Sequence, residues 1–268
     1  MNFLSRIPIG QFIPGDSFVH RLDPRSKLLF TLLFVVLIFF ADEPRTYIFL
    51  ICFTLLSLFA SRISLSYLFR SLKPIIWLIL LTVLVHIFMT KGGSLVWEWK
   101  WFSVYEEGLR QAILISVRLI VLIIMASLLT LTTSPLDLTD GIERLLQPLA
   151  RFNFPAHDLA MMMSISLRFI PTLLEEMDKI MKAQMSRGAY FDSGGLVKRT
   201  QALVPLLIPL FVSAFRRAEE LALAMEARGY RGAIGRTKLR ELAWSRTDGV
   251  FLVLVILMVV LFFLIRQW

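Results

Sequence analysis

Apolar residues gather in five stretches that polar segments separate. These stretches are Leu28–Ala41, Tyr47–Ala60, Pro74–Thr90, Ile113–Thr133 and Val250–Ile265. A helix needs about 17–25 residues to cross the hydrocarbon core of a bilayer, so the pattern predicts five transmembrane helices. The first two are short and must borrow flanking residues, tilt or form a tight hairpin. Pro74 follows Lys73 and is expected in the first turn of the third helix.

Between residues 134 and 247, apolar positions recur every seven residues, with charged residues on the opposite face. The first repeat is Met163, Ile170 and Met177; the second is Val204, Phe211, Ala218 and Met225, interleaved with Ile208, Phe215 and Ala222. Residues seven apart share one helical face, so we expect two long amphipathic helices at or beneath the cytoplasmic membrane face. The alanines of the second repeat are expected to let these helices cross closely. A shorter helix, Leu136–Arg151, is predicted before them, with Ser134 as its N-cap.

Both amphipathic segments end in an Arg-Gly pair, Arg187-Gly188 and Arg228-Gly229. Glycine just beyond a helix adopts the left-handed conformation with little strain, and the helix dipole favours a cation in the last turn. One such end is therefore explained by helix termination alone. Two such ends at the tips of crossed helices indicate a binding role in addition, because arginine forms forked hydrogen bonds with carboxylates or carbonyls of a partner. The pair predicts a two-pronged contact with a partner of two-fold or pseudo-two-fold symmetry.

The composition supports a membrane protein and the charge gives an orientation. Hydrophobic residues make up 57% of the chain and charged residues 18%, against about 45–50% and 25% in soluble domains. Residues 1–27, 61–73 and 134–247 carry net charges of +2, +3 and +4, whereas 42–45 and 91–108 carry −1 each. Because basic loops stay in the cytoplasm, the N-terminus is predicted to be cytoplasmic.

Other chemistry in the sequence is sparse. Cys52 is the single cysteine, which excludes a disulfide framework, and the three histidines have no metal-ligand spacing, so no metal site is predicted. The motif G-x-x-x-x-G-K-[ST] is absent, so we expect no ATP hydrolysis by this chain. Arg118 lies inside the fourth apolar stretch, where a charge is costly; a structural and a functional role are both open.

Two alternative functions follow from these residues. The first is a stand-alone secondary transporter with Arg118 and His86 as an ion relay, although no intramembrane cluster of acids supports it. The second is a membrane enzyme that uses the carboxylates of residues 137–143, namely Asp137, Asp140 and Glu143. The second lacks a nucleophile with an adjacent base.

The sequence resembles the transmembrane T component of energy-coupling factor transporters, which import vitamins and metal ions with a pair of cytoplasmic ATPases. The resemblance rests on Phe12–Ser17, His20–Leu28, Ser166–Pro171 and both Arg-Gly ends, and it covers nearly the whole chain. The family often has Ala-Arg-Gly at both ends. Here the second copy begins with Ala227, but the first begins with Ser186.

The resemblance implies an all-α membrane protein with about five transmembrane helices and a cytoplasmic coupling module, without catalytic activity, cofactor or nucleic acid partner. The expected parts are a leader (1–27), four transmembrane helices (28–133), the coupling module (134–247) and a last transmembrane helix (248–268). Residues implied to dock on two ABC-type ATPase subunits are Ser186, Arg187, Gly188, Ala227, Arg228 and Gly229. One or several interchangeable substrate-binding membrane subunits are expected to rest on Met163, Ile170, Met177, Phe211, Phe215 and Met225. The resemblance places the protein in the bacterial cell membrane.

Overall fold

The computed structural model describes residues 12–99, 102–152, 154–189, 196–230, 232 and 244–267. The chain divides into two compact units. We call Phe12–Gly141 with Leu242–Trp268 the bundle unit, and Met1–Gln11 with Ile142–Glu241 the arm unit. The first eleven residues of the predicted leader lie outside the described residues.

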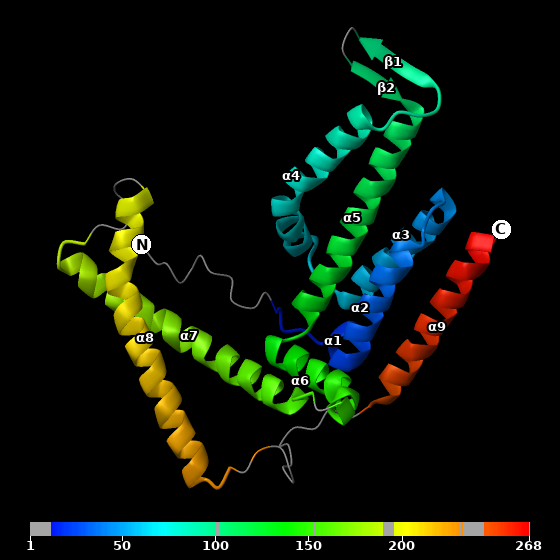
Figure 1. Ribbon diagram of the computed structural model, residues 1–268. Helices are drawn as coiled ribbons and strands as arrows, with labels where there is room; N and C mark the ends of the chain where they lie inside the picture. Colours follow the sequence, from blue (N-terminus) through cyan, green and yellow to red (C-terminus); the bar gives the residue numbers. More distant parts are fainter. Residues whose placement is uncertain are drawn as a thin grey trace. The chain divides into compact units, whose positions relative to one another are not determined.

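The bundle unit is built from helices and one short hairpin (Figure 1). Its helices are α1 (Phe18–Arg21), α2 (Pro24–Phe39), α3 (Pro44–Ser61), α4 (Leu65–Met89), α5 (Glu106–Thr132) and α9 (Arg246–Gln267). The antiparallel strands β1 (Leu95–Trp99) and β2 (Phe102–Tyr105) connect α4 to α5. Helix α6 (Pro135–Leu146) begins in the bundle unit and ends in the arm unit.

Four helices in the described part of the chain are long and apolar enough to cross a membrane: α3, α4, α5 and α9. The expected all-α membrane architecture is therefore confirmed. The first predicted stretch forms α2, which has 16 residues. At 1.5 Å per residue α2 is about 24 Å long, less than the roughly 30 Å of hydrocarbon in a bilayer.

The prediction for Pro74 is wrong. Helix α4 begins nine residues earlier, at Leu65, and Pro74 lies in its interior. The basic residues that suggested a loop, Arg70 and Lys73, are good helix formers, and they continue the helix through this segment. A proline in a helix interior loses one hydrogen bond and favours a bend, but the helix continues on both sides of it.

The core of the bundle unit joins α2, α3, α5 and α9. Phe34, Ile38, Leu50 and Phe262 have no exposed surface, and Leu131 is only 1% exposed. Aromatic rings from three of these helices meet beside them: the ring centroid of Phe30 lies 5.6 Å from that of Phe53 and 5.2 Å from that of Phe251. Ring pairs at such distances stabilise a core beyond the area that they bury.

Helix α4 packs on α5 through a glycine. A Cβ atom at Gly108 would lie 2.9 Å from the carbonyl oxygen of His86 and 3.0 Å from that of Thr90. Only glycine therefore allows the backbones to approach this closely without a shift. The ring of His86 lies 3.4 Å from the hydroxyl of Thr90 on the next turn.

Arg118 has structural partners at the far end of α2. Its Nε donates to the hydroxyl of Tyr47 at 3.0 Å, and its Nη2 donates to the carbonyl of Ala41, just beyond α2, also at 3.0 Å. The guanidinium also lies 5.5 Å from the centre of the Phe39 ring. A charge at this depth is stabilised by such contacts. Of the two roles that the sequence left open for Arg118, these contacts support the structural one.

Helix α6 begins as predicted. The hydroxyl of Ser134 accepts a hydrogen bond from the backbone N–H of Asp137 at 3.1 Å and donates to its carboxylate at 2.7 Å. This confirms Ser134 as the N-cap. The predicted helix Leu136–Arg151 is α6 followed by a 3₁₀ segment, η2 (Gln147–Phe152).

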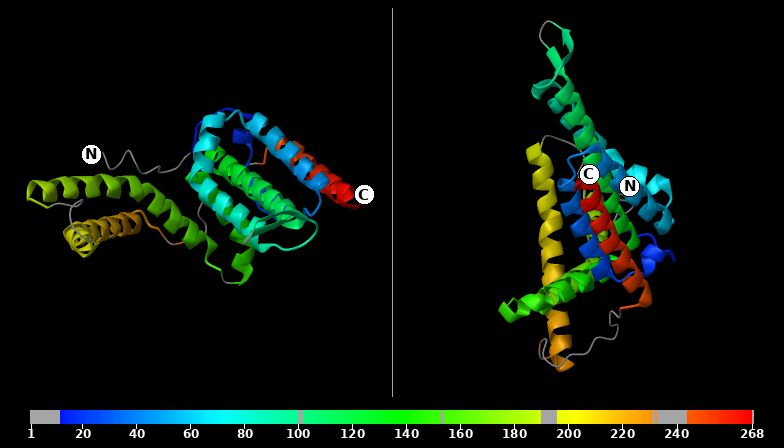
Figure 2. Two further views of the ribbon diagram at one scale, coloured as in Figure 1. Left: turned by 90° about the horizontal axis from the view of Figure 1, so that it is seen from above. Right: turned by 90° about the vertical axis from the view of Figure 1, so that its right-hand side faces the viewer.

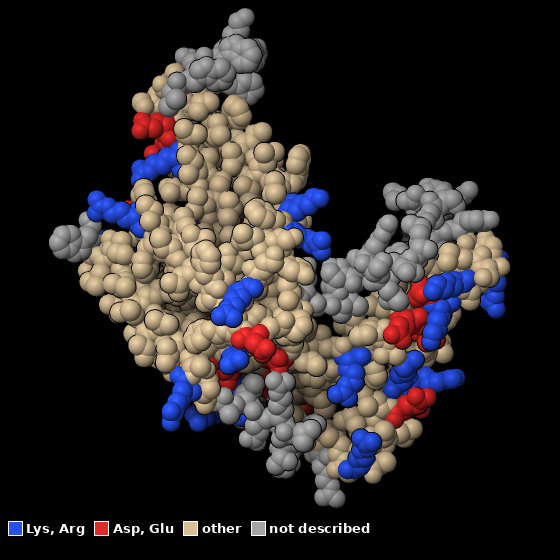
Figure 3. All heavy atoms as spheres, turned by 180° about the vertical axis from the view of Figure 1, so that it is seen from behind, with Lys and Arg blue, Asp and Glu red and all other residues tan. Residues whose placement is uncertain are grey.

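The arm unit continues with two long helices, α7 (Ala156–Ser186) and α8 (Leu196–Ala227). They have 31 and 32 residues, so each is about 47 Å long. On the face shown in Figure 3, basic and acidic side chains are interspersed along the arm unit, whereas the bundle unit is mostly uncharged. The two predicted amphipathic helices are therefore present as single long helices.

The leader folds around His20, at the end of α1. Its Nδ1 lies 2.6 Å from the hydroxyl of Ser17, and its Nε2 lies 3.0 Å from the carbonyl oxygen of Ile13. The carbonyl requires a proton on Nε2, so in the neutral ring Nδ1 accepts from the hydroxyl. Burial lowers the pKa of His20 below 6.5, and the charge of Lys27 adds to this effect.

Acidification is expected to destabilise the bundle unit through His20. The pKa of His20 is lowered in the folded state, so as the pH falls below 6.5 the unfolded chain takes up this proton first. The stability that neutral His20 contributes is present above pH 6.5 and is lost as the pH falls through the folded-state pKa. Thermal unfolding in detergent at pH 7.5 and pH 5 should show a larger drop in Tm for the wild type than for His20→Gln. Equal drops would contradict this assignment.

Candidate functional site: two Arg-Gly helix ends

The end of α7 is closed by a glycine in the left-handed conformation. Arg187 is the C-cap, and Gly188 follows with φ of 88°. The N–H of Gly188 donates to the carbonyl of Met185, and the N–H of Ala189 to that of Gln184, both at 3.0 Å. These two bonds form a Schellman motif, which satisfies carbonyls that the helix itself leaves without donors.

The end of α8 repeats this geometry. Gly229 has φ of 73°, and its N–H donates to the carbonyl of Glu226 at 2.8 Å. The N–H of Tyr230 donates to the carbonyl of Met225 at 3.0 Å. The predicted closure by glycine is confirmed at both ends. No atom of the described residues lies within 4 Å of a Cβ placed at either glycine, so the backbone conformation is what requires glycine there.

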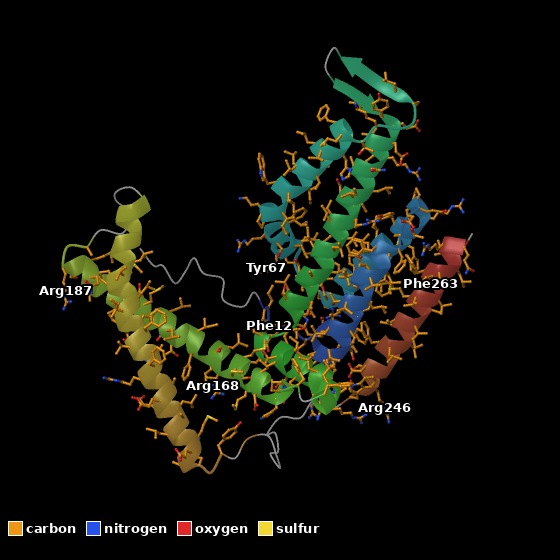
Figure 4. All side chains as sticks on the ribbon, in the orientation of Figure 1. Phe12, Tyr67, Arg168, Arg187, Arg246 and Phe263 are labelled. Carbon is orange, nitrogen blue, oxygen red and sulfur yellow. The ribbon has the colours of Figure 1, made fainter. Side chains whose placement is uncertain are left out.

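Both arginines are exposed to solvent. Arg187 and Arg228 are exposed, as are the preceding residues Ser186 and Ala227. Among the described residues, neither guanidinium forms a hydrogen bond or an ion pair, and Figure 4 shows Arg187 at the far end of α7. The backbone carbonyls already have donors, so these guanidinium groups remain available for a partner.

The two helices cross, and contacts between them hold the crossing (Figures 1 and 2). Nη2 of Arg217 on α8 lies 3.6 Å from Oε2 of Glu176 on α7. Each of these residues precedes the Arg-Gly arginine of its own helix by eleven positions, which is about 16 Å along the axis. The hydroxyl of Tyr230 also donates to the sulfur of Met161 at 3.1 Å. The two Arg-Gly ends therefore lie at similar distances along their helices from this ion pair.

The apolar residues predicted to contact another membrane subunit lie largely at the surface. Phe211 and Phe215 are 61% and 72% exposed, and Met163 and Ile170 are 43% and 36% exposed. Met177 and Met225, the other two predicted contact residues, are half-buried. An apolar surface of this kind marks a site that lipid or another protein covers.

The alanines of the second repeat do not form the crossing. Ala218 and Ala222 are both exposed. Among the residues of α8 whose burial is described, the more buried positions are Leu206, Leu210, Ser213, Ala214, Arg217, Leu221 and Met225, which mostly recur every three or four residues. Helix α8 is apolar on more than one side, so the seven-residue pattern alone cannot identify the side that packs.

The carboxylates of residues 137–143 have structural neighbours. Asp137 bonds to the N-cap Ser134, and Oε1 of Glu143 lies 2.9 Å from Nδ1 of His157 within the arm unit. Asp140 also has an interaction partner. These contacts explain the carboxylates as parts of a helix start and of the α6–α7 packing.

The comparisons with known proteins agree with this architecture. Residues 15–239 match the family described as cobalt transport protein. The chain is 61% identical over 257 residues to the energy-coupling factor transporter transmembrane protein EcfT of Brevibacillus brevis, with 96% of this chain and 97% of the relative covered. The chain belongs to the energy-coupling factor transporter transmembrane protein family. The EcfT proteins of Bacillus subtilis and Clostridium kluyveri are 55% and 51% identical, again over at least 96% of this chain and 97% of each relative.

Membership of the energy-coupling factor transporter transmembrane protein family makes the chain a multi-pass component of a bacterial membrane transporter. It is a non-catalytic component. The family match includes both Arg-Gly ends and the leader from residue 15 onward. The predicted resemblance is confirmed, with identities of 61% and 55% over nearly the full length.

Valine in place of Gly188 or Gly229 is expected to unwind the last turn of its helix. A residue with a Cβ in the left-handed conformation costs about 1–2 kcal/mol, and a β-branched side chain is the least suited to it. Asparagine tolerates this conformation, so Gly188→Asn is the matched control. Hydrogen exchange of the amides of residues 184–189 should be faster in Gly188→Val and close to wild type in Gly188→Asn. Identical exchange in both variants would refute the requirement.

Proposed function

We propose that this chain transmits the work of two cytoplasmic ATPase subunits to a separate substrate-binding membrane subunit, in the ATP-driven import of a vitamin or other micronutrient. The pair of Arg-Gly ends carries this proposal. Arg187 and Arg228 stand on the same backbone motif, are both exposed, and lie the same number of residues beyond the Arg217–Glu176 ion pair. Two equivalent tips are what a dimer of equivalent ATPase subunits needs.

The chemistry of each tip suits insertion into a groove. A guanidinium presents several N–H donors in a fixed plane and binds carboxylates or backbone carbonyls in a forked arrangement. At Gly188 and Gly229 no atom from the described part of the chain lies where a side chain would begin, so a partner can approach the backbone beside each arginine. Ser186 and Ala227, the residues before them, are small and exposed and belong to the same contact.

Helices α7 and α8 provide the mechanical connection. ATP binding and hydrolysis move the ATPase pair, and the two arginines pass this movement to the helices. The Arg217–Glu176 ion pair and the contact of Tyr230 with Met161 make the crossing move as one body. The movement then reorients the substrate-binding subunit.

The substrate-binding subunit rests on the exposed apolar face of the arm unit. Phe211 and Phe215 form its most exposed part on α8, and Met163 and Ile170 extend it on α7. Methionine and aromatic side chains adapt to different apolar partners, which suits one or several interchangeable substrate-binding subunits. The excess of basic residues in segments 1–27 and 134–247 supports a cytoplasmic position for the N-terminus and the arm unit, on the side where the ATPases act.

Replacement of both arginines by glutamate is expected to separate the chain from the ATPases. Each charge-assisted hydrogen bond contributes about 1.5–3 kcal/mol, so the double variant Arg187→Glu/Arg228→Glu should lose affinity by about a hundredfold or more. Co-purification in mild detergent and ATP-driven uptake in proteoliposomes measure the effect. Arg216→Glu, also exposed on α8, is the control and should keep both activities. Unchanged assembly and uptake in the double variant would disprove the proposal.

Polar residues on the apolar face are expected to release the substrate-binding subunit while the ATPases stay bound. Burial of a phenylalanine contributes about 1.5–3 kcal/mol, so Phe211→Ser/Phe215→Ser should weaken this contact at least about tenfold. The bound subunits after purification are identified by mass spectrometry. Phe152→Ser is the control, because Phe152 is 86% exposed but lies on η2, outside the face. Retention of the membrane subunit by the double variant would place its contact elsewhere.

A further inference from the structure

The start of α2 contacts the junction at which α5 ends and α6 begins. Lys27 is 95% buried there although it is charged at neutral pH in water. Its Nζ donates to the carbonyl of Thr132 at 3.0 Å, to the hydroxyl of Thr133 at 3.2 Å and to the carbonyl of His20 at 3.3 Å. All three ammonium hydrogens therefore have acceptors.

Lys27 fixes the break between the two helices. Thr132 is the last residue of α5, so its carbonyl lacks a donor within the helix and receives one from Lys27. Thr133 is extended, with φ of −134° and ψ of 128°, and it turns the chain towards α6. Lys27 lies before the apolar part of α2. Burial lowers the pKa of its ammonium group to about 8. The negative charges of three carboxylates act in the opposite direction and raise this pKa: Asp137, Asp248 and Asp23. The ammonium thus lies among opposite charges.

Helix α6 packs directly on the same segment. A Cβ atom at Gly141 would lie 3.1 Å from Cδ1 of Leu28 and 3.2 Å from Cβ of Pro24. The first half of α6 is therefore held closer to α2 than a larger side chain would allow, and Thr139 in that half is only 2% exposed. Beyond Gly141, the same helix continues into the arm unit.

The segment is also bonded to the start of α9. Asp248 is 1% exposed, and its Oδ1 accepts a hydrogen bond from the N–H of Asp23 at 2.7 Å. Its Oδ2 accepts from the N–H of Ser245 at 2.9 Å. Residues 23–28 thus contact the end of α5, the first half of α6 and the start of α9.

We propose that residues 23–28 form a clamp that fixes the first half of α6 to α2 and to the end of α5, and that movement of the arm unit enters the membrane helices at this clamp. The second part rests on the proposed function. A lever transmits movement only if its base is fixed. Without the clamp, rotation about the extended backbone of Thr133 would absorb the movement of α6 before it reached α5.

Hydrogen exchange of the purified full chain in detergent tests the clamp itself. Lys27→Met removes the three hydrogen bonds, and Gly141→Val wedges α6 away from α2 without touching them. Both variants should accelerate amide exchange in residues 135–141 at least about tenfold and leave α7 unchanged. The controls are Lys73→Met, exposed on α4, and Gly249→Val, where no atom of the described residues lies within 4 Å of the added Cβ. Exchange no faster than in these controls would overturn the clamp. If Lys27→Met fails to fold, the result for Gly141→Val alone decides whether the clamp exists.

Transport in the reconstituted complex tests the role of the clamp in coupling. The clamp variants should still bind both ATPases, because Arg187 and Arg228 are intact. The ATPases in these complexes should still hydrolyse ATP, but uptake per ATP hydrolysed should fall at least about tenfold. Unchanged uptake per ATP in assembled complexes would reduce the clamp to a stabilising contact and overturn its coupling role. If the wild type binds no ATPases, the proposed function fails, while the exchange experiment still decides whether the clamp exists.

Discussion

The last carbonyl groups of a helix have no donors within the helix, and this constraint shapes the protein at three helix ends. In the bundle unit, the charged side chain of Lys27 satisfies the carbonyl at the end of α5. Arg118 donates in the same way to the carbonyl of Ala41, just beyond α2. In the arm unit, Gly188 and Gly229 satisfy them with backbone N–H groups alone. The first solution buries a cation and joins segments that are distant in the sequence. The second leaves the neighbouring arginine exposed. The need to satisfy helix-end carbonyls therefore gives a fixed helix end in the bundle unit and helix ends with exposed arginines in the arm unit.

The two units also differ in how they bury and expose apolar surface. The bundle unit buries a small aromatic and aliphatic core where α2, α3, α5 and α9 meet, and α4 is attached through the close approach at Gly108. Much of the remaining apolar surface is exposed, as expected where lipid replaces water as the solvent. The arm unit exposes Phe211 and Phe215 in addition, on a helix that also carries many charges. A helix of that mixed character suits a protein contact better than a transmembrane position.

Three charged side chains inside the bundle unit each have more than one hydrogen-bond partner. Lys27 has three oxygen acceptors, the half-buried Arg118 has a hydroxyl and a carbonyl, and Asp248 accepts from two backbone N–H groups. A buried charge is tolerated only when it is hydrogen-bonded in this way. Because the partners come from separate helices, such a charge also fixes which helix ends lie together. The bundle unit therefore has defined contacts at α2 and at the α5–α6 junction.

The sequence by itself determined the features that depend on neighbouring residues. Five apolar stretches predicted transmembrane helices, and four of them lie in described helices of spanning length. Ser134 predicted the start of α6, and the two Arg-Gly pairs predicted the ends of α7 and α8, because periodicity and capping act within a few residues. Only the tertiary structure decided that Pro74 lies within a helix and that the alanines of α8 face outward. It also supplied the partners of Arg118, 71 and 77 residues away along the chain, and those of Lys27 at Thr132 and Thr133. Such contacts arise from the packing of whole helices, and no local pattern records which face of one helix meets which end of another.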